Sequence, residues 1–260
     1  MKPYNFLTIA GSDSGGGAGI QADLKTATML GGFGTSAITA LTAQNTCGVN
    51  DIHPVPLDFI AAQLTAILSD IDIHVIKSGM LFNADIINVI AQIIPDNVPY
   101  ILDTVMIAKG GALLLQENAI EAMKQHLFHK ALLITPNLPE LEALSGGISV
   151  THAQNLIRDY GCQNVLIKGG HDTGYVATDI LVTPNDIYKF SLPRIVTKAG
   201  HGTGCTLSSA IACYIAQGLV LNDAVDKAKK YVYEALKSAL PIGNGHHPLN
   251  HNYSIQSLTS

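Results

Sequence analysis

A glycine-rich segment late in the chain, residues 200–206, reads Gly-His-Gly-Thr-Gly-Cys-Thr and runs directly into a helical pattern. In the first turn of a helix, backbone N–H groups have no helical partner and the helix dipole is positive. Gly202, Thr203 and Gly204 would therefore present N–H groups that bind phosphate or stabilise a developing negative charge. The same position lowers the pKa of a thiol, so we predict that Cys205 is a base or a nucleophile. The alternative is that Cys205 is only a small core side chain.

A second glycine-rich segment, residues 11–19, follows the first apolar run of the chain. It lacks the lysine of a P-loop, and Ile20 stands at the last glycine position of the dinucleotide-binding motif. Its five glycines nevertheless exceed what a tight turn requires and let the backbone approach a ligand closely. A loop that faces a ligand is therefore favoured over a plain turn.

Polar side chains also stand at the ends of other apolar runs, namely Asp103, Asn137, Glu140 and Lys168. In parallel sheets, ligands bind beyond the carboxyl ends of the strands, so these groups should meet at one edge of the sheet. Acids, an amide and an ammonium are the groups that Mg²⁺ and nucleotide phosphates need. Asn137 and Glu140 could instead simply cap the helix that follows them.

Expected strands and expected helices, which would position these groups, alternate along the chain. This alternation predicts a mostly parallel sheet with right-handed crossovers and helices on both faces, an α/β fold. No repeat or linker divides the chain, so we expect a single domain over residues 1–260. Residues 46–56 are predicted to form a flap over the site. The expected strands are 6–10, 35–41, 74–77, 100–102, 131–134, 165–167, 178–182 and 187–190, and the expected helices include 21–30, 56–69, 84–94, 112–126, 205–217 and 222–240.

Composition excludes several classes of protein. A hydrophobic content of 47% with a net charge of -5 rules out disorder, and 15 Lys and Arg against 20 Asp and Glu leave no basic field for nucleic acid. No apolar run approaches the roughly 18 residues of a membrane span, and we expect no signal peptide. The four cysteines form no disulfide-like pattern, which predicts a cytoplasmic protein. Only 13% of residues are charged, so we expect part of the surface to be covered in a homo-oligomer, most simply a homodimer.

Taken together, the motifs at residues 10–23, 39–46, 77–81 and 202–206 resemble those of the hydroxymethylpyrimidine/phosphomethylpyrimidine kinases of thiamine biosynthesis. That family belongs to the ribokinase-like superfamily, and the resemblance covers nearly the whole chain. It implies a three-layer α/β/α sandwich around a mostly parallel central sheet. It also implies two ATP-dependent phosphorylations, first of 4-amino-5-hydroxymethyl-2-methylpyrimidine and then of its monophosphate. ATP and Mg²⁺ are the implied cofactors, and whether a monovalent cation is also required is left open.

The resemblance further implies a role for each matching residue. Cys205 corresponds to the catalytic base, and Gly202, Thr203 and Gly204 correspond to an anion hole for the transferred phosphoryl group. A glutamine amide can pair at once with the amino group and the ring nitrogen of an aminopyrimidine. The remaining assignments are Gln44, Gly11, Asp23, Met80 and Val105 to the pyrimidine pocket, Lys168 and Asn137 to nucleotide or phosphate binding, and Asp103 and Glu140 to the metal.

The chain departs from the family pattern at two places beside the phosphate site. Thr104 stands where the family commonly has proline, and Ala199-Gly200 stand where it has Asn-Thr. Both changes are predicted to loosen the backbone. Two other functions stay open, a pyridoxal kinase of the same superfamily and a non-catalytic sensor of pyrimidines or nucleotides.

Overall fold

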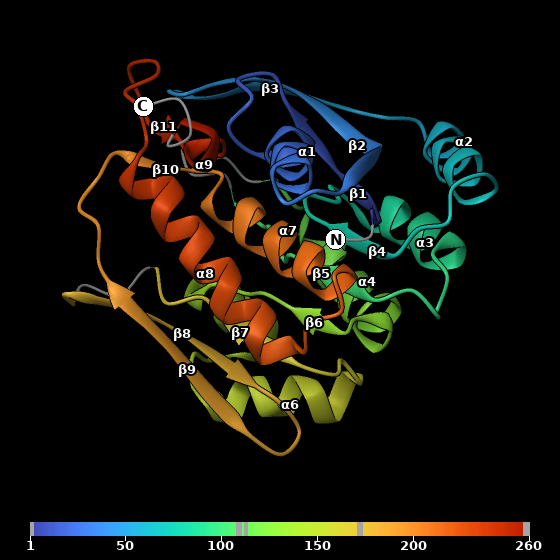
Figure 1. The fold of residues 1–260 in the computed structure, drawn as a ribbon. Coiled ribbons are helices and arrows are strands. Elements are labelled where there is room, and N and C mark those ends of the chain that lie inside the picture. The colour runs from blue at the N-terminus through green and yellow to red at the C-terminus, as the bar shows by residue number, and fades with distance from the viewer. Residues whose placement is uncertain (1–2, 108–110, 112–113, 171–173, 257–260) are drawn as a thin grey trace.

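A computed structural model describes residues 3–107, 111, 114–170 and 174–256 of the chain. Within these residues, nine strands form one sheet in the order β3-β2-β1-β4-β5-β6-β7-β8-β9 (Figure 1). Neighbours from β2 to β7 pair in parallel, whereas β3 at one edge and β8 and β9 at the other pair antiparallel. The strands are β1 (Asn5–Asp13), β2 (Phe33–Asn45), β3 (Gly48–Pro54), β4 (Val75–Ser78), β5 (Tyr100–Leu102), β6 (Leu133–Ile134), β7 (Val165–Ile167), β8 (Val176–Val182) and β9 (Ile187–Pro193), and a separate parallel pair is formed by β10 (Ala199–His201) and β11 (His247–Pro248).

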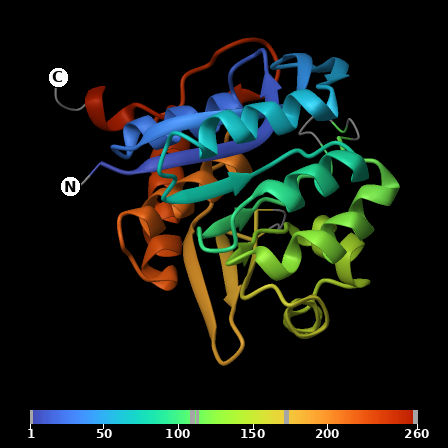
Figure 2. The ribbon, with the colours of Figure 1, turned by 90° about the vertical axis from the view of Figure 1, so that its right-hand side faces the viewer.

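Helices cover both faces of the sheet, and each face has its own apolar core. Side chains of α1, α7 and α8 pack together on one face, and those of α2 to α6 pack on the other. Figure 2 shows the orange helices α7 and α8 and the green helices on opposite sides of the strands. The helices are α1 (Gly19–Met29), α2 (Leu57–Leu68), α3 (Ala84–Ile93), α4 (Glu117–His126), α5 (Leu138–Ser145), α6 (Val150–Tyr160), α7 (Thr203–Ala216), α8 (Leu221–Lys237) and α9 (Tyr253–Gln256), with a 3-10 turn η1 (Phe128–Lys130) after α4.

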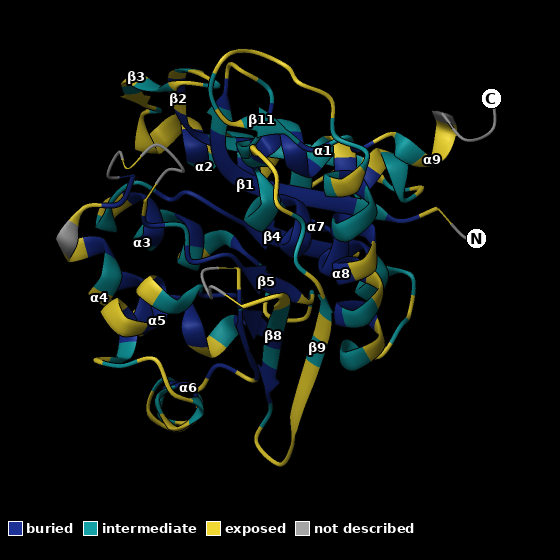
Figure 3. Cartoon of the chain, turned by 90° about the vertical axis from the view of Figure 1, so that its left-hand side faces the viewer, coloured by how far each residue is buried: buried dark blue, intermediate teal, exposed yellow. Residues whose placement is uncertain are grey.

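The central strands are apolar on both sides because helices cover both of their faces. Every residue of β4, β5, β6 and β7 is buried. Figure 3 shows these strands in dark blue and the outward faces of the helices in yellow and teal. The predicted three-layer α/β/α fold with a mostly parallel sheet is therefore confirmed.

Several elements differ from the sequence expectations, which did not include β3, α6, α9 or the pair β10 and β11. β3 occupies most of the predicted flap, and it is an edge strand whose exposed residues give no buried alternating pattern. α6 is not among the expected helices, and only Ala153 and Leu156 of its 11 residues are buried. The first residues of the expected helix 112–126 lie outside the described part of the chain. Among the described residues, no helix combines the length and the apolar character that crossing a bilayer requires.

Candidate active site

The amino end of α7 forms one wall of the site. Gly202 precedes the helix with φ +84, and the first helical bond runs from Thr206 N to Gly202 O at 2.9 Å. The amides of residues 203–205 therefore have no partner within the helix. A Cβ at Gly202 would lie 1.9 Å from the carbonyl oxygen of Gly17, in the first glycine segment. Close approach of two backbones and a left-handed conformation thus both require glycine at this position.

Lys168 and two carboxylates lie against this helix end. Lys168 Nζ is 2.7 Å from Asp103 Oδ1 and 3.6 Å from Glu140 Oε2. A Cβ on Gly204 would be 3.4 Å from Lys168 Nζ and 3.7 Å from Asp103 Oδ2. The structure therefore brings together Asp103, Glu140, Lys168 and the open amides of α7, as the strand-end argument predicted.

The charges of this cluster shift one another's pKa values. Burial alone would raise the pKa of Asp103, but the ammonium groups of Lys168 and Lys77 outweigh it and lower the pKa. Burial and the nearby Asp103 carboxylate raise the pKa of Glu140, against the opposing effect of Lys168. Burial would lower the pKa of Lys168, but the two carboxylates raise it above its usual value. The cluster thus holds a permanent cation beside the predicted phosphate site.

Asn137 and Glu140 do cap a helix. Asn137 Oδ1 accepts from Glu140 N at 2.9 Å, and Glu140 Oε2 accepts from Asn137 N at 2.9 Å, a capping box at the start of α5. Thr104, which is fully buried, also donates to Glu140 Oε2 at 3.1 Å. The threonine thereby makes a side-chain bond that a proline has no hydroxyl to make.

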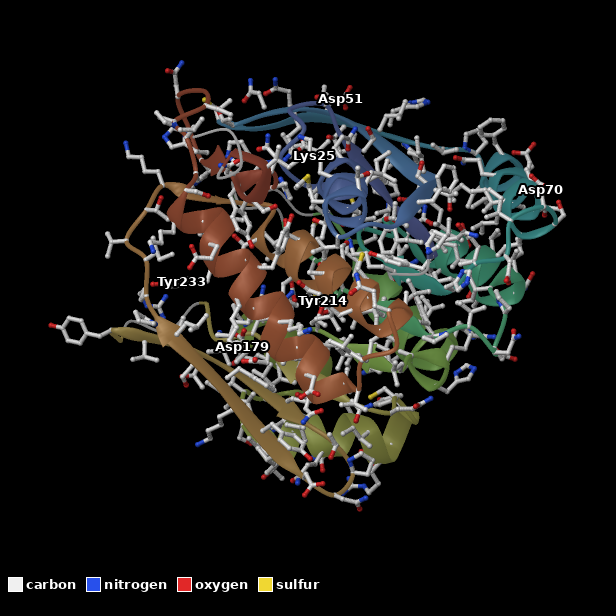
Figure 4. All side chains as sticks on the ribbon, in the orientation of Figure 1. Lys25, Asp51, Asp70, Asp179, Tyr214 and Tyr233 are labelled. Carbon is white, nitrogen blue, oxygen red and sulfur yellow. The ribbon has the colours of Figure 1, made fainter. Side chains whose placement is uncertain are left out.

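The backbone next to Lys168 is also fixed by hydrogen bonds to residues of β8 and α8. The next residue, Gly169, donates its N–H to Asp179 Oδ1 at 2.8 Å, and Asp179 Oδ2 accepts from Lys229 Nζ at 2.7 Å. Figure 4 labels Asp179 beside α8, which carries Lys229. The backbone at Lys168 is therefore fixed by a buried ion pair between β8 and α8.

Cys205 is partly exposed, and its surroundings are polar. The backbone N–H of Gly19, at the start of α1, lies close enough to the sulfur to oppose a rise in the pKa of the thiol. Burial raises the pKa of the thiol to about 11, with Asp23 and Asp103 adding to the rise and Lys77 opposing it. The prediction of a lowered pKa is therefore wrong, because loss of hydration outweighs the attraction of the helix end.

Three residues expected in the pyrimidine pocket lie together near this thiol. A Cβ on Gly11 would be 3.0 Å from Met80 Sδ, and Met80 belongs to a small apolar cluster against which Val105 packs. A Cβ on Gly19 would be 2.4 Å from Gly11 O. A continuous run of contacts therefore leads from this apolar cluster through Gly19 to Cys205.

Asp23, in contrast, does not line the pocket. Its side chain is fully buried and accepts from Thr8 Oγ1 at 2.6 Å, from Ser209 Oγ at 2.7 Å and from Lys77 Nζ at 2.9 Å. These partners come from β1, α7 and β4, so Asp23 joins three elements behind the site. The expectation that it contacts the pyrimidine is corrected, since its oxygens are occupied by protein donors.

The first glycine segment folds around the side chain of Asp13. Its Oδ1 accepts from Gly15 N at 2.8 Å, and Oδ2 accepts from Gly17 N at 3.0 Å and Ala18 N at 2.8 Å. Gly16 N donates to Asp13 O at 2.9 Å. These four amides point inward, so the prediction that this loop offers its N–H groups to a ligand is wrong for them. Lys25, labelled on α1 in Figure 4, closes the loop by donating to Gly16 O at 2.7 Å.

Gln44 is partly exposed at the end of β2, and it is linked to groups that the sequence reasoning missed. Its Nε2 lies 3.4 Å from His201 Nε2, which in turn lies 2.7 Å from Asp13 Oδ2. Asp13, Lys77 and His201 all stand inside the motifs already singled out. The only sequence signal for a role of these residues was their chemical type, since a carboxylate, an ammonium and an imidazole stand close to glycines.

A magnesium ion fits the donor set of the site. Among the described residues, no three His, Cys, Asp or Glu side chains converge on one point. Mg²⁺ in phosphoryl-transfer enzymes commonly uses only one or two carboxylates together with substrate phosphates and water. Asp103 and Glu140, two carboxylates beside an anion-binding helix end, meet that need.

Comparison with known structures places this geometry in a class. Pyridoxal kinase from Staphylococcus aureus is 34% identical with a TM-score of 0.88, covering 98% of this chain and 95% of that one. Phosphomethylpyrimidine kinase from Clostridium difficile is 39% identical with a TM-score of 0.75, covering 89% of this chain and 99% of that one. The fold and the site define a small-molecule kinase of the ribokinase-like class.

Sequence comparison narrows the class to one family. A family model described as phosphomethylpyrimidine kinase matches residues 13–250. The hydroxymethylpyrimidine/phosphomethylpyrimidine kinase of Haemophilus influenzae is 50% identical over 257 residues, which are 94% of this chain and 95% of the relative. The bifunctional thiamine biosynthesis protein ThiED of Geobacter sulfurreducens is also 50% identical, and this chain spans 53% of its length. The chain belongs to the phosphomethylpyrimidine kinase family.

Proposed function

We propose that this phosphotransferase uses ATP to phosphorylate 4-amino-5-hydroxymethyl-2-methylpyrimidine and then its monophosphate, giving the diphosphate for thiamine biosynthesis. One observation carries the proposal: the Cys205 thiol is near Gly19, which lies against Gly11 of the expected pyrimidine pocket, and also near Asp103, which pairs with the Lys168 cation at 2.7 Å. An alcohol held on the first side would face a γ-phosphate held on the second. The relatives named for this activity cover nearly the whole chain.

The two sides of the site divide the work of binding. Gln44 would pair with the amino group and ring nitrogen of the pyrimidine, while Met80 and Val105 cover its flat faces. The amides at residues 202–204 and Lys168 would hold the transferred phosphoryl group and its developing charge. Mg²⁺ bound by Asp103 and Glu140, near Asn137, would neutralise negative charge on the nucleotide phosphates.

Cys205 would remove the proton of the hydroxymethyl group in the first step. The alcohol oxygen forms a bond to the γ-phosphorus, the bond to the ADP oxygen breaks, and the thiolate takes the proton. A phosphate monoester has a second pKa near 6 and is largely ionised at neutral pH, so the second step needs no base. The two phosphorylations should therefore differ in their dependence on Cys205.

A two-step assay with Cys205→Ala tests this function. ADP release with the alcohol should fall by about 100-fold or more, while release with the monophosphate falls far less. Cys213→Ala is the matched control, because that thiol is buried in the core of the same helix. Equal losses in both steps would assign Cys205 a structural role. If the unaltered enzyme phosphorylated neither pyrimidine, the proposed function itself would be wrong.

A second candidate substrate is pyridoxal, since the pyridoxal kinase of Staphylococcus aureus shares 34% identity and a TM-score of 0.88 with this chain. Pyridoxal has no aminopyrimidine edge for Gln44 to pair with. Gln44→Leu should thus impair phosphorylation of the pyrimidine alcohol and leave any activity with pyridoxal largely intact. A sensor without catalysis would release no ADP with either alcohol.

We further propose a single catalytic domain that works as a homodimer in the cytoplasm. The support is the low charged fraction of 13% and the four cysteines, all of which are free thiols. Sedimentation of the purified protein would measure the oligomeric state. Assays with and without K⁺ would decide whether a monovalent cation is needed.

A further inference from the structure

The end of β2, which carries Gln44, extends beyond the parallel part of the sheet. The last residue pair between β1 and β2 is Asp13 with Thr42, and a bulge in the pairing of β2 with β3 lies between Ala43 and Gln44. In the described part of the chain, the end of β2 therefore pairs with the edge strand β3 alone. A two-stranded ribbon is only marginally stable in water, so the position of Gln44 depends on other contacts.

One of these contacts comes from the first glycine segment. The hydroxyl of Ser14 donates to Gln44 O at 2.7 Å, and its oxygen accepts from Gln44 N at 2.8 Å. A Cβ on Gly15 would lie 3.1 Å from Asn45 Cα. One side of the end of β2 is thus held by the loop that follows β1.

A second contact comes from a segment close to the other end of the chain. His246 N donates to Thr46 O at 2.7 Å, and Gly245 N donates to Thr46 Oγ1 at 3.2 Å. A Cβ on Gly245 would lie 2.0 Å from Thr46 O, and a Cβ on Gly243 would lie 2.3 Å from Thr46 Oγ1. Both positions therefore require glycine, because the segment lies directly on the turn between β2 and β3.

Residues 243–247, the C-terminal strap, are in turn anchored to the phosphate side of the site. His247 N donates to Lys198 O at 3.0 Å, and β11 pairs with β10, which leads into α7 (Figure 1). A few residues further on, the buried His251 places its Nε2 3.0 Å from Thr206 Oγ1 on α7. One segment therefore joins the end of β2 to the amino end of α7.

We propose that the C-terminal strap is a positioning element for the pyrimidine: by holding Thr46, it sets where Gln44 stands relative to the open amides of α7. The inference rests on the proposed function and deepens it, because it assigns part of pyrimidine recognition to residues outside the expected pocket. An amide that must pair with two groups of a ring at once binds weakly when its backbone is free to move, since ordering it costs free energy on binding. The strap supplies that order before the substrate binds.

Gly245→Ala tests the proposal, because the added Cβ cannot be accommodated unless the strap and Thr46 move apart. In calorimetry, the Kd for the pyrimidine alcohol should rise at least about tenfold, while the Kd for a non-hydrolysable ATP analogue changes less than about twofold. Gly48→Ala, in the same hairpin, is the matched control, since its added Cβ would meet no atom of the described residues within 4 Å. An unchanged Kd for the alcohol in Gly245→Ala overturns the proposal.

A double-mutant cycle separates positioning of Gln44 from a general loss of structure. If the strap acts through Gln44, Gly245→Ala should weaken alcohol binding by less than about twofold once Gln44→Leu has removed the amide. Equal fold-changes in the two backgrounds overturn the proposal. Thr46→Val is a milder variant that keeps the shape of the side chain and removes the acceptor of Gly245 N–H. It should raise the Kd for the alcohol about threefold, and Thr46→Ser should restore it.

Hydrogen exchange measured by NMR tests the strap without turnover. The amides of residues 44–46 should exchange faster in Gly245→Ala, or in Thr46→Val where Gly245→Ala does not fold, and should be unaffected by Gly48→Ala. Binding of the alcohol to the unaltered protein should slow exchange of the His246 amide, because coupling between two sites is reciprocal. Unchanged exchange at residues 44–46 in the variants overturns the proposal. An unaltered protein that shows these exchange effects of the variants but binds no pyrimidine alcohol would refute the proposed function and retain the strap as the support of β2.

Discussion

The pKa of Cys205 leads to a prediction about its chemical reactivity. Burial beside Asp23 and Asp103 raises this pKa to about 11. At pH 7.5, roughly one molecule in 3,000 would then carry the thiolate, which is the form that alkylating reagents attack. The rate of alkylation should therefore rise about tenfold per pH unit from pH 7.5 to pH 10.

The measurement needs a protein in which Cys205 is the reactive thiol. Cys47 is exposed and is replaced by serine, whereas Cys162 and Cys213 are 1% and 0% exposed and serve as internal controls. Iodoacetamide labelling at each cysteine is followed by mass spectrometry over the pH series. Labelling at Cys162 or Cys213 would report unfolding and would set the upper pH limit of the experiment.

A rate of Cys205 labelling that levels off below about pH 9 would refute the reasoning, because the thiolate would then be stabilised more than burial disfavours it. If the slope persists, kcat/KM for the first phosphorylation should rise over the same range. The second phosphorylation, whose phosphate oxygen is already ionised, should respond less. A common pH profile for both steps would remove Cys205 from the base role.

Three sets of substitutions probe the surroundings of the site. Lys77→Met leaves the Asp23 carboxylate buried without its cation, so the free energy of unfolding measured in urea should fall by about 3–5 kcal/mol. Adding Asp23→Asn should restore part of this loss. A loss below about 1 kcal/mol would contradict the buried ion pair. Gly202→Ala should abolish activity and lower the Tm, because its Cβ would lie 1.9 Å from Gly17 O. Gly204→Ala should keep the Tm, because its Cβ would come no closer than 3.4 Å to another atom, that of Lys168 Nζ. An equal effect of both changes on the Tm would contradict the close contact between Gly202 and Gly17. Thr104→Val removes one buried hydrogen bond and should cost about 1 kcal/mol, and an unchanged unfolding free energy would show that the bond contributes nothing.

The meeting of Asp103, Glu140 and Lys168 could be predicted from the sequence. Each residue follows an apolar run, and parallel strands place all such positions at one edge of the sheet. That inference needs the order of strand and helix but no side-chain detail. It therefore holds even where the strand boundaries differ by one or two residues.

The environments of Asp23 and Cys205 could not be predicted in the same way. The partners of Asp23 include Lys77, 54 residues away, and Ser209, 186 residues away, so no local pattern reveals them. The helix-end argument for Cys205 was local as well, and it omitted the desolvation that packing of α1 against α7 imposes. Both errors concern how much water a side chain retains, which only tertiary structure decides.

The two glycine segments show why composition alone does not identify an anion-binding loop. In the first, Asp13 accepts N–H groups at Gly15, Gly17 and Ala18, so a protein carboxylate occupies the place that a ligand anion would take. In the second, Gly202 leads into α7 and the following amides have no helical partner. The acidic side chain two residues before Gly15 thus makes the first turn self-satisfied, whereas no acidic side chain stands directly before the second segment. Asp13 also holds His201, which belongs to the second segment, at 2.7 Å, so the first loop fixes the position of a side chain while the second leaves backbone amides open.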